Sequence, residues 1–443
     1  MALSVDEVLA LSPDASSAKA ARGLTGTSQW PTLGISEVAA WGECQGSGAK
    51  PYQTQVDLNG PVFRCSCPSR KFPCKHGLAL LLLRAQAPSA FTTNTPPLWV
   101  SEWLESRAER AQKKQEQQAE KTATAVDPDA SAKREAQRWK RIQSASVELQ
   151  RWLADQVTRG LGSVTQESLE NWKTMAARMV DAQAPGLGQR ILAAAESVRT
   201  SPERALHHLG LLHLACEALQ RLDLLDPALQ AELRTVVGWP FDKTEVLAVG
   251  EHVEDHWTVL GVIAEAVDAK LVERRVWLFG QQTGRRALLL EHAFGGRGFE
   301  QTWRTGTCVA ARLAFFPGSR KLRALPVEIT LLETVSLALP LSLEHEWSVL
   351  SERAAESPWA PLHPMLLRDS IVLRVGDDAP NVRVVCDNEA LPISIDDASF
   401  WQMLAVTGGR KHHIAGEWDG ECFRPLSIWA DESVRTIWQW GQP

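Results

Sequence analysis

The chain has 443 residues, a net charge of −6 and 44% apolar residues. These are the proportions of a soluble protein with room for about three domains. The first residues carry acids where a secretory signal needs bases, and the longest apolar run, Leu78 to Leu83, is too short to span a bilayer. We therefore expect a cytoplasmic protein that does not enter membranes.

The cysteines are distributed unevenly. Three of the eight, Cys65, Cys67 and Cys74, fall within ten residues, and the other five lie one per segment at Cys44, Cys216, Cys308, Cys386 and Cys422. A secreted disulfide framework is usually denser and its chain shorter. The five scattered cysteines are expected to be reduced and mostly buried, and the sequence leaves open whether Cys44 lies near the cluster.

The cysteine cluster follows a predicted hairpin. Asn59-Gly60 separates two strand-like runs, Tyr52–Leu58 and Val62–Cys67, and this dipeptide suits a tight turn. Side chains repeat every two residues along a strand, so Cys65 and Cys67 would point to the same face. Two thiolates could then reach one ion.

A second pair of ligands follows the hairpin. Cys74 and His76 cannot share a face inside a helix, so we expect Cys74 just before a helix and His76 in its first turn, with Pro73 stiffening the entry. Three sulfurs and one imidazole complete a tetrahedron with no position left for water. The pattern predicts one structural Zn²⁺ held by Cys65, Cys67, Cys74 and His76.

Basic residues surround the predicted finger. Between Lys50 and Arg84 there are six bases and one acid, a local charge of +5, or about +4 once three thiolates hold a zinc ion. Two interpretations remain open. The side chains could contact phosphates or a partner, with the aromatic ring stacking or inserting, or they could form a solvated rim with the ring packed inward. The candidate contact residues are Arg64, Arg70, Lys71, Phe72 and Lys75.

The remaining chain divides by composition. Residues 101–133 are polar and predict a charged, partly helical linker, whereas 134–238 carry a 3.6-residue apolar stripe and predict a bundle of about five helices. Ser201-Pro202 and Asp226-Pro227 have the form of helix starts. Including the finger module over 1–100, this gives five segments, of which the last two, 239–335 and 336–443, are predicted to be β-rich.

In residues 239–443, short apolar runs separated by Gly, Pro and Asn predict β-strands. We expect a helical turn near 397–402 among these strands. The fold class is therefore α+β, with an N-terminal ββα zinc module, a helical bundle and antiparallel sheets. The predicted strands are Trp257–Ala264, Val272–Gly280, Ala287–Ala293, Thr307–Phe316, Leu322–Val327, Ile371–Val375, Val382–Cys386, Met403–Thr407 and Cys422–Ala430.

Other polar patterns favour structural roles. His252-Val-Glu-Asp-His256 has no third ligand nearby, and Gly295-Gly296-Arg297-Gly298 lacks the Lys-Ser/Thr of a phosphate loop. The sequence contains no nucleophile elbow, zinc-protease or dinucleotide motif, which favours a non-enzymatic protein. An enzyme in the β-rich half would require a deep pocket with clustered acids or histidines.

The motif Cys65-x-Cys67-x6-Cys74-x-His76 resembles the SWIM zinc finger, which has this ligand pattern on a ββα frame. The flanking residues Trp41 to Gly48 and Phe72 to Gly77 resemble those of bacterial SWIM-finger proteins of this length. Such proteins are often encoded beside a MoxR-type AAA+ ATPase and a von Willebrand A-domain protein. The resemblance implies a finger that binds proteins or DNA.

Taken with the acidic chain, these features predict a zinc-binding adaptor that uses the finger as a docking surface, with an AAA+ ATPase or A-domain protein as its candidate partner. The alternative is a DNA- or RNA-binding protein that uses the basic rim.

Overall fold

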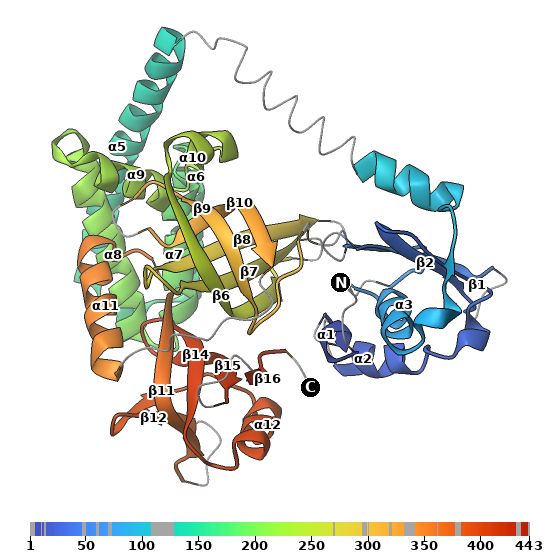
Figure 1. The fold of residues 1–443 in the computed structure, drawn as a ribbon. Helices are drawn as coiled ribbons and strands as arrows, with labels where there is room; N and C mark the ends of the chain where they lie inside the picture. Colours follow the sequence, from blue (N-terminus) through green and yellow to red (C-terminus); the bar gives the residue numbers. More distant parts are fainter. Residues whose placement is uncertain are drawn as a thin grey trace.

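The computed structural model describes most of the chain (Figure 1). The residues outside the description are 1–4, 10, 13–14, 47–49, 59–61, 70–72, 108–127, 269–270, 295–298, 300, 319–320, 332–341, 361, 377–381, 431–435 and 442–443. Among the described residues, no helix is long and apolar enough to cross a membrane. Helical and antiparallel β parts alternate along the chain, which confirms the α+β class.

The N-terminal part is a five-stranded sheet covered by helices. Its strand order is β4-β3-β2-β1-β5. The predicted hairpin is the β3–β4 pair, and the prediction missed that β2 and β1 extend the same sheet. The elements are α1 (Val5–Leu9), α2 (Ala15–Arg22), β1 (Thr32–Ile35), β2 (Ala39–Cys44), β3 (Tyr52–Asp57), β4 (Val62–Cys65), α3 (Lys75–Gln86) and β5 (Thr92–Thr93).

Helix α3 is the centre of this part. Its residues from His76 to Leu83 are all buried, because the sheet lies on one side and α1 and α2 lie on the other. A helix that is apolar all round must be covered in this way. On the opposite face of the sheet, residues 98–107 are helical and place Val100 and Trp99 near Trp41. The packed part therefore includes residues up to 107.

The bundle consists of five helices with one apolar core. Ser201 and Asp226 cap α8 and α9 as predicted, each with its side chain accepting a backbone N–H and Pro at the first helical position. The described part of the predicted 101–133 linker is helical, since residues 128–133 already belong to α5. The helices are α5 (Pro128–Arg159), α6 (Gln166–Asp181), α7 (Pro185–Ser197), α8 (Pro202–Gln220) and α9 (Pro227–Val236).

A short helix, α10 (Lys243–Val249), leads into a closed barrel of five strands with the order β10-β8-β7-β6-β9. The barrel closes through a parallel pairing of β8 with β10 and an antiparallel pairing of β6 with β9. This is the strand order of an OB-type barrel. The five predicted strands are confirmed, four of them longer than predicted and β9 one residue shorter at each end: β6 (Glu251–Ala266), β7 (Leu271–Gly280), β8 (Arg286–Phe294), β9 (Cys308–Phe315) and β10 (Arg323–Leu331).

The C-terminal part is a six-stranded sheet, β13-β12-β11-β14-β15-β16, with two helices. One predicted strand is wrong: Met403–Thr407 is the second half of helix α12, whose Phe400 and Met403 are buried against the sheet. An apolar run is compatible with either element, and the cap at Asp396 decides for the helix. The elements are α11 (Leu343–Glu356), β11 (His363–Arg374), β12 (Val382–Cys386), β13 (Glu389–Pro392), α12 (Asp397–Thr407), β14 (His412–Trp418), β15 (Phe423–Trp429) and β16 (Thr436–Gln439).

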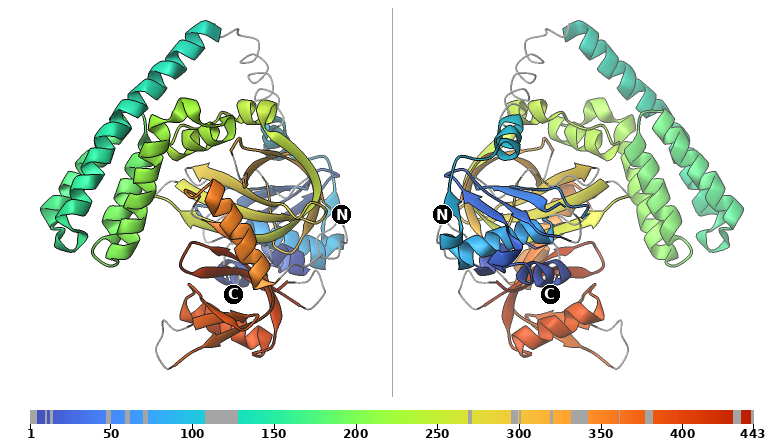
Figure 2. Two further views of the ribbon diagram at one scale, coloured as in Figure 1. Left: turned by 90° about the vertical axis from the view of Figure 1, so that its left-hand side faces the viewer. Right: turned by 90° about the vertical axis from the view of Figure 1, so that its right-hand side faces the viewer.

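The C-terminal sheet lies against the outside of the barrel (Figures 1 and 2). Trp277 of β7 is fully buried there and donates from Nε1 to Glu417 of β14 at 2.9 Å. A Cβ on Gly261 would lie 2.5 Å from the Cβ of Leu426, so β6 and β15 are in close contact. OB barrels bind oligonucleotides on the outer face of their second and third strands. In this chain the second strand is β7, and the sheet covers that part of the face.

Candidate metal centre

The four predicted ligands meet at one point of the N-terminal part. The ligand atoms of Cys65, Cys67, Cys74 and His76 all lie within 4.8 Å of one another. Cys65 is the last residue of β4, and Cys67 follows it in a bend rather than in the strand as predicted. Cys74 is the N-cap of α3 and His76 lies in its first turn, as predicted.

Local structure explains this convergence. The β3–β4 register places Cys65 opposite Thr54, and the Thr54 hydroxyl lies 3.2 Å from the Cys65 sulfur. The Cys74 sulfur accepts the backbone N–H of Gly77 at 3.5 Å, so one ligand also caps the helix. A Cβ on Gly77 would lie 2.8 Å from the Phe63 ring. Glycine at this position therefore lets α3 approach the hairpin closely enough to share an ion.

The centre is largely enclosed. Cys74 and His76 are each only 5% exposed, and the Tyr52 ring lies 4.9 Å from the imidazole. The His76 Nδ1 atom is 3.7 Å from the Cys65 sulfur. Three sulfurs and one ring nitrogen are the donor set of closed structural zinc sites. The residues fit one structural Zn²⁺, which would bind all four side chains and leave no ligand position open.

Charge within the cluster also suits a cation. Hydrogen bonds with Cys65 and then Cys74 lower the pKa of Cys67, and the same bonding raises the pKa of Cys65. Burial would lower the pKa of His76, but hydrogen bonds to Cys67 and Cys74 raise it to about 9. In the metal-free site the thiols and the imidazole share protons, and a metal ion that binds there displaces those protons.

Cys44 lies at the end of β2, where burial raises the pKa of its thiol to about 11. It is not one of the four clustered ligands.

Comparisons with protein families agree with this geometry. Residues 52–85 match the SWIM zinc finger, and residues 137–237 match the SWIM-associated four-helix bundle domain. The chain therefore contains a SWIM zinc finger and the helical bundle domain associated with it. The second match covers most of the bundle, α5 through α9, which sequence reasoning could not assign to a family. The comparisons with curated proteins and with solved structures gave no match.

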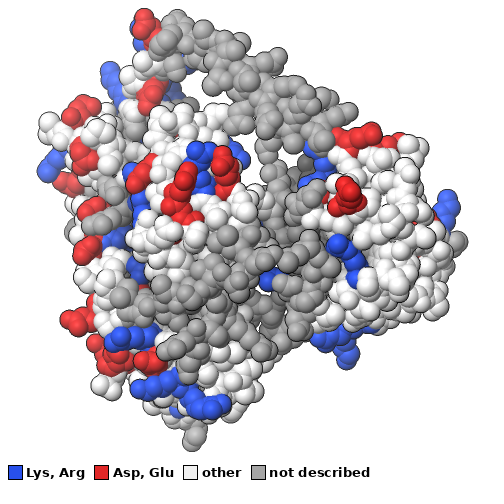
Figure 3. All heavy atoms as spheres, viewed as in Figure 1, with Lys and Arg blue, Asp and Glu red and all other residues white. Residues whose placement is uncertain are grey.

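The predicted rim of this SWIM finger is described only in part. Arg64 on β4 and Lys75 at the start of α3 are exposed. Arg70, Lys71 and Phe72 lie outside the described residues. On the face of the molecule seen in Figure 3, acidic and basic side chains are interspersed over the bundle and barrel.

The remaining histidine patterns hold no second metal cluster among the residues that the structure describes. Instead, the Nε2 atom of His252 is 2.9 Å from the backbone oxygen of Leu247.

Sequence reasoning missed one polar site, a pocket between α5 and the residues that follow α9. Arginines recur along α5 at Arg134, Arg138 and Arg141, a spacing that keeps side chains on one face of a helix. This spacing was the available signal, but nothing in the sequence shows what the arginines face.

Proposed function

We propose that this SWIM-type protein is a non-enzymatic adaptor that binds a protein partner through its zinc finger. The supporting observation is the closed Cys3His donor set, in which an enclosed ion would order the finger surface without contacting a substrate. Exposed Arg64 and Lys75 flank that surface and would favour an acidic partner.

The candidate partner class is an AAA+ ATPase or a von Willebrand A-domain protein, which rests on the resemblance to bacterial SWIM-finger proteins alone. We place the adaptor in the cytoplasm, because the three cysteines of the zinc site must stay reduced to bind the ion and a reducing compartment keeps thiols in that state.

The second candidate is nucleic-acid binding through the same rim. Exposed Arg64 and Lys75 favour it, because two cations beside a finger can contact phosphates. One observation counts against it: the chain as a whole carries a charge of −6. Binding of nucleic acid at the barrel instead of the rim is disfavoured separately, because the C-terminal sheet covers β7.

The test removes the rim charges while keeping the zinc ligands. Tagged full-length chain is recovered from native cytoplasm with and without nuclease, and the Arg64→Ala/Lys75→Ala variant is compared with wild type. The matched control is Lys19→Ala/Arg22→Ala, which removes two exposed cations from α2 of the same part. We expect nuclease-resistant recovery of one stoichiometric protein, reduced in the rim variant and retained in the control.

A salt titration distinguishes the second candidate. If Arg64 and Lys75 contact phosphates, the logarithm of duplex affinity should fall with the logarithm of salt concentration, and the rim variant should flatten that slope by about 2. Micromolar duplex binding at physiological salt, lost in the rim variant only, would replace the adaptor proposal with nucleic-acid binding.

A further inference from the structure

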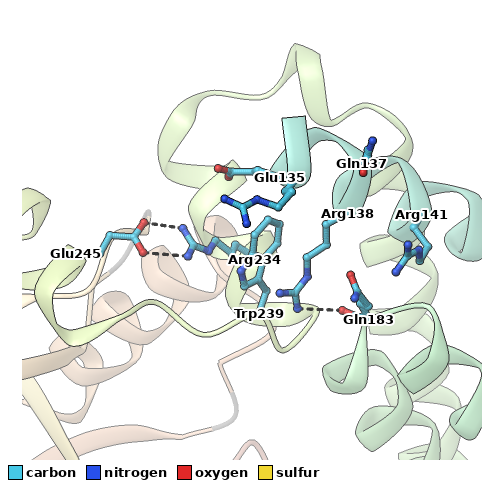
Figure 4. Close-up of a pocket in the computed structure, with 9 residues that line it drawn as sticks. Glu135, Gln137, Arg138, Arg141, Gln183, Arg234, Trp239 and Glu245 are labelled. Carbon is cyan, nitrogen blue, oxygen red and sulfur yellow. Dashed lines mark hydrogen bonds and ion pairs between the residues drawn. The ribbon is translucent and has the colours of Figure 1, made fainter. Parts of the chain in front are cut away.

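An arginine-lined pocket lies between the first turns of α5 and the segment that joins α9 to α10 (Figure 4). Its volume is about 630 Å³, and its walls carry four guanidinium groups and two carboxylates. One of the four, Arg234, is already neutralised, because it makes two hydrogen bonds to Glu245 at 2.6 and 2.9 Å. The other three belong to α5.

Among the described residues, no carboxylate forms an ion pair with Arg134, Arg138 or Arg141, although ion pairs are common elsewhere on the surface. Arg138 donates from Nη2 to the backbone oxygen of Gln183 at 3.2 Å, and its Nε–H is buried without an acceptor. Burial and the nearby Arg234 lower the pKa of Arg138. The pocket therefore carries a net positive charge, because its four guanidinium groups outnumber its two carboxylates.

Two of the four arginines, Arg138 and Arg234, are held in place by an aromatic ring. The guanidinium of Arg138 lies 4.1 Å from the centre of the Trp239 ring, and that of Arg234 lies 4.9 Å from it. Trp139 packs against the same ring at 5.3 Å. Cation–π contacts of this kind fix the side chains in position. They also occupy the Trp239 ring, so it is not available to stack on a nucleobase.

Backbone geometry at the pocket is unusual. Gln183 follows helix α6 with a φ of 65°, in the left-handed region where glycine is preferred. The backbone N–H of Gln183 donates to the carbonyl oxygen of Val180, and the N–H of Ala184 donates to that of Met179. This is the Schellman arrangement at a helix end. This turn directs the Gln183 carbonyl to Arg138. A residue other than glycine is thus kept at a strained position on the pocket wall.

The spacing of the arginines indicates a ligand shape. Residues separated by four and seven positions lie on one face of a helix, about 6 and 10.5 Å apart along its axis. Carboxylates at the same intervals on another helix would match them. We propose that this pocket binds an acidic helical segment of a protein partner, whose carboxylates pair with Arg134, Arg138 and Arg141. This extends the adaptor function proposed above to a second surface.

A protein segment suits the pocket better than nucleic acid. Glu135 and Glu245 lie among the arginines and would repel a backbone that carries a phosphate at every step. A peptide carries its carboxylates at separate positions, so these can lie beside the arginines and away from the two glutamates. The covered ring of Trp239 also removes the stacking that single-stranded nucleic acids use.

The experiment measures fluorescence anisotropy of a labelled, alanine-based helical peptide with Glu at positions spaced four and seven residues apart, added to the full-length zinc-loaded chain. The control peptide has Gln in place of Glu. We expect micromolar binding of the acidic peptide, weakened on the order of tenfold by Arg138→Gln/Arg141→Gln because two charged pairs are lost. Arg151→Gln/Arg159→Gln, on exposed positions of the same helix, should leave the affinity unchanged.

A gain of affinity provides a second readout that partial unfolding would not produce. Glu135→Gln removes an exposed acid from the pocket and should tighten binding of the acidic peptide about twofold or more. Equal binding of the Gln peptide, or equal loss in both arginine double variants, would overturn the proposal. So would oligo-dT binding that competes with the peptide and is lost in the same variant. The Arg64→Ala/Lys75→Ala variant should still bind the peptide, which separates this site from the finger.

Discussion

The zinc finger and the junction between the barrel and the C-terminal sheet place polar groups inside the protein in opposite ways. In the finger, four ligands from a twelve-residue stretch converge on one point. In the junction, charged pairs join residues far apart in the chain, such as Arg286 with Glu346 and Arg275 with Glu417. A local cluster can order a small part by binding an ion, whereas distant pairs form only after the larger parts have folded and met.

The junction is the more buried of the two. Arg286 donates from Nη2 to both oxygens of Glu346 at 2.6 Å, and Glu346 is 0% exposed. Burial raises the pKa of Glu346 even though Arg286 lies beside it. Such a pair is weak evidence of net stability, but breaking it leaves an unpaired buried charge. The following predictions test whether the two regions depend on separate interactions.

The largest effect is expected from loss of the metal. Cys67→Ser removes one ligand, and structural zinc in small fingers contributes on the order of 10–16 kcal/mol of apparent binding free energy. The part around residues 50–90 should unfold, while the barrel and bundle keep their cooperative transition. Zinc content by mass spectrometry and limited proteolysis measure this, with Cys422→Ser as the control. A metal-free, protease-resistant finger would contradict the prediction.

A smaller effect is expected at the junction. Arg286→Met should cost about 3–5 kcal/mol of unfolding free energy, because it leaves the Glu346 carboxylate buried and unpaired. The double variant Arg286→Met/Glu346→Leu should recover most of that loss, and zinc content should not change in either. Denaturant unfolding of the barrel measures both. If the double variant is as unstable as the single one, the ion pair itself is needed and the comparison with the finger fails.

Acid should affect the junction through His363. This side chain accepts from Arg353 at Nδ1 over 2.9 Å, and burial, with nearby Arg286 and Arg353, lowers its pKa to about 2. In the unfolded chain His363 has the ordinary histidine pKa of about 6.5, so below that pH the unfolded chain binds a proton that the folded chain does not. The contribution of the neutral His363 to folding stability is therefore complete above about pH 6.5 and decreases as the pH falls.

Between pH 7 and 5 the expected loss is about 2 kcal/mol. His363→Gln cannot bind this proton and should remove that part of the pH dependence. The barrel transition must be followed separately, because acid also displaces zinc from the finger. An unchanged pH dependence in His363→Gln would show that His363 is not the titrating group.

The smallest effect is expected at a helix end of the bundle, where neither a metal ligand nor a junction pair is changed. Gln183→Gly should stabilise the bundle by about 1 kcal/mol, because glycine adopts the left-handed backbone without strain. Gln183→Ala is the control and should give no such gain. Thermal unfolding measures both. If glycine destabilises the bundle, the contacts of the Gln183 side chain contribute more to stability than its left-handed backbone costs.

The order of residues alone determined the zinc ligands, the helix caps at Ser201 and Asp226 and the five strands of the barrel, because each is set by spacing within one or two turns or strands. The strand predicted at Met403–Thr407 failed because an apolar run is compatible with either element until its cap is seen.

Only the tertiary structure decided which distant residues meet. The pairing of Arg275 and Trp277 with Glu417, about 140 positions later, depends on how a barrel and a sheet pack. The same holds for the arginine pocket. The sequence spaces Arg134, Arg138 and Arg141 along one helix, but packing alone places Trp239 and Gln183 against Arg138. Packing also leaves the three arginines without an ion pair among the described residues.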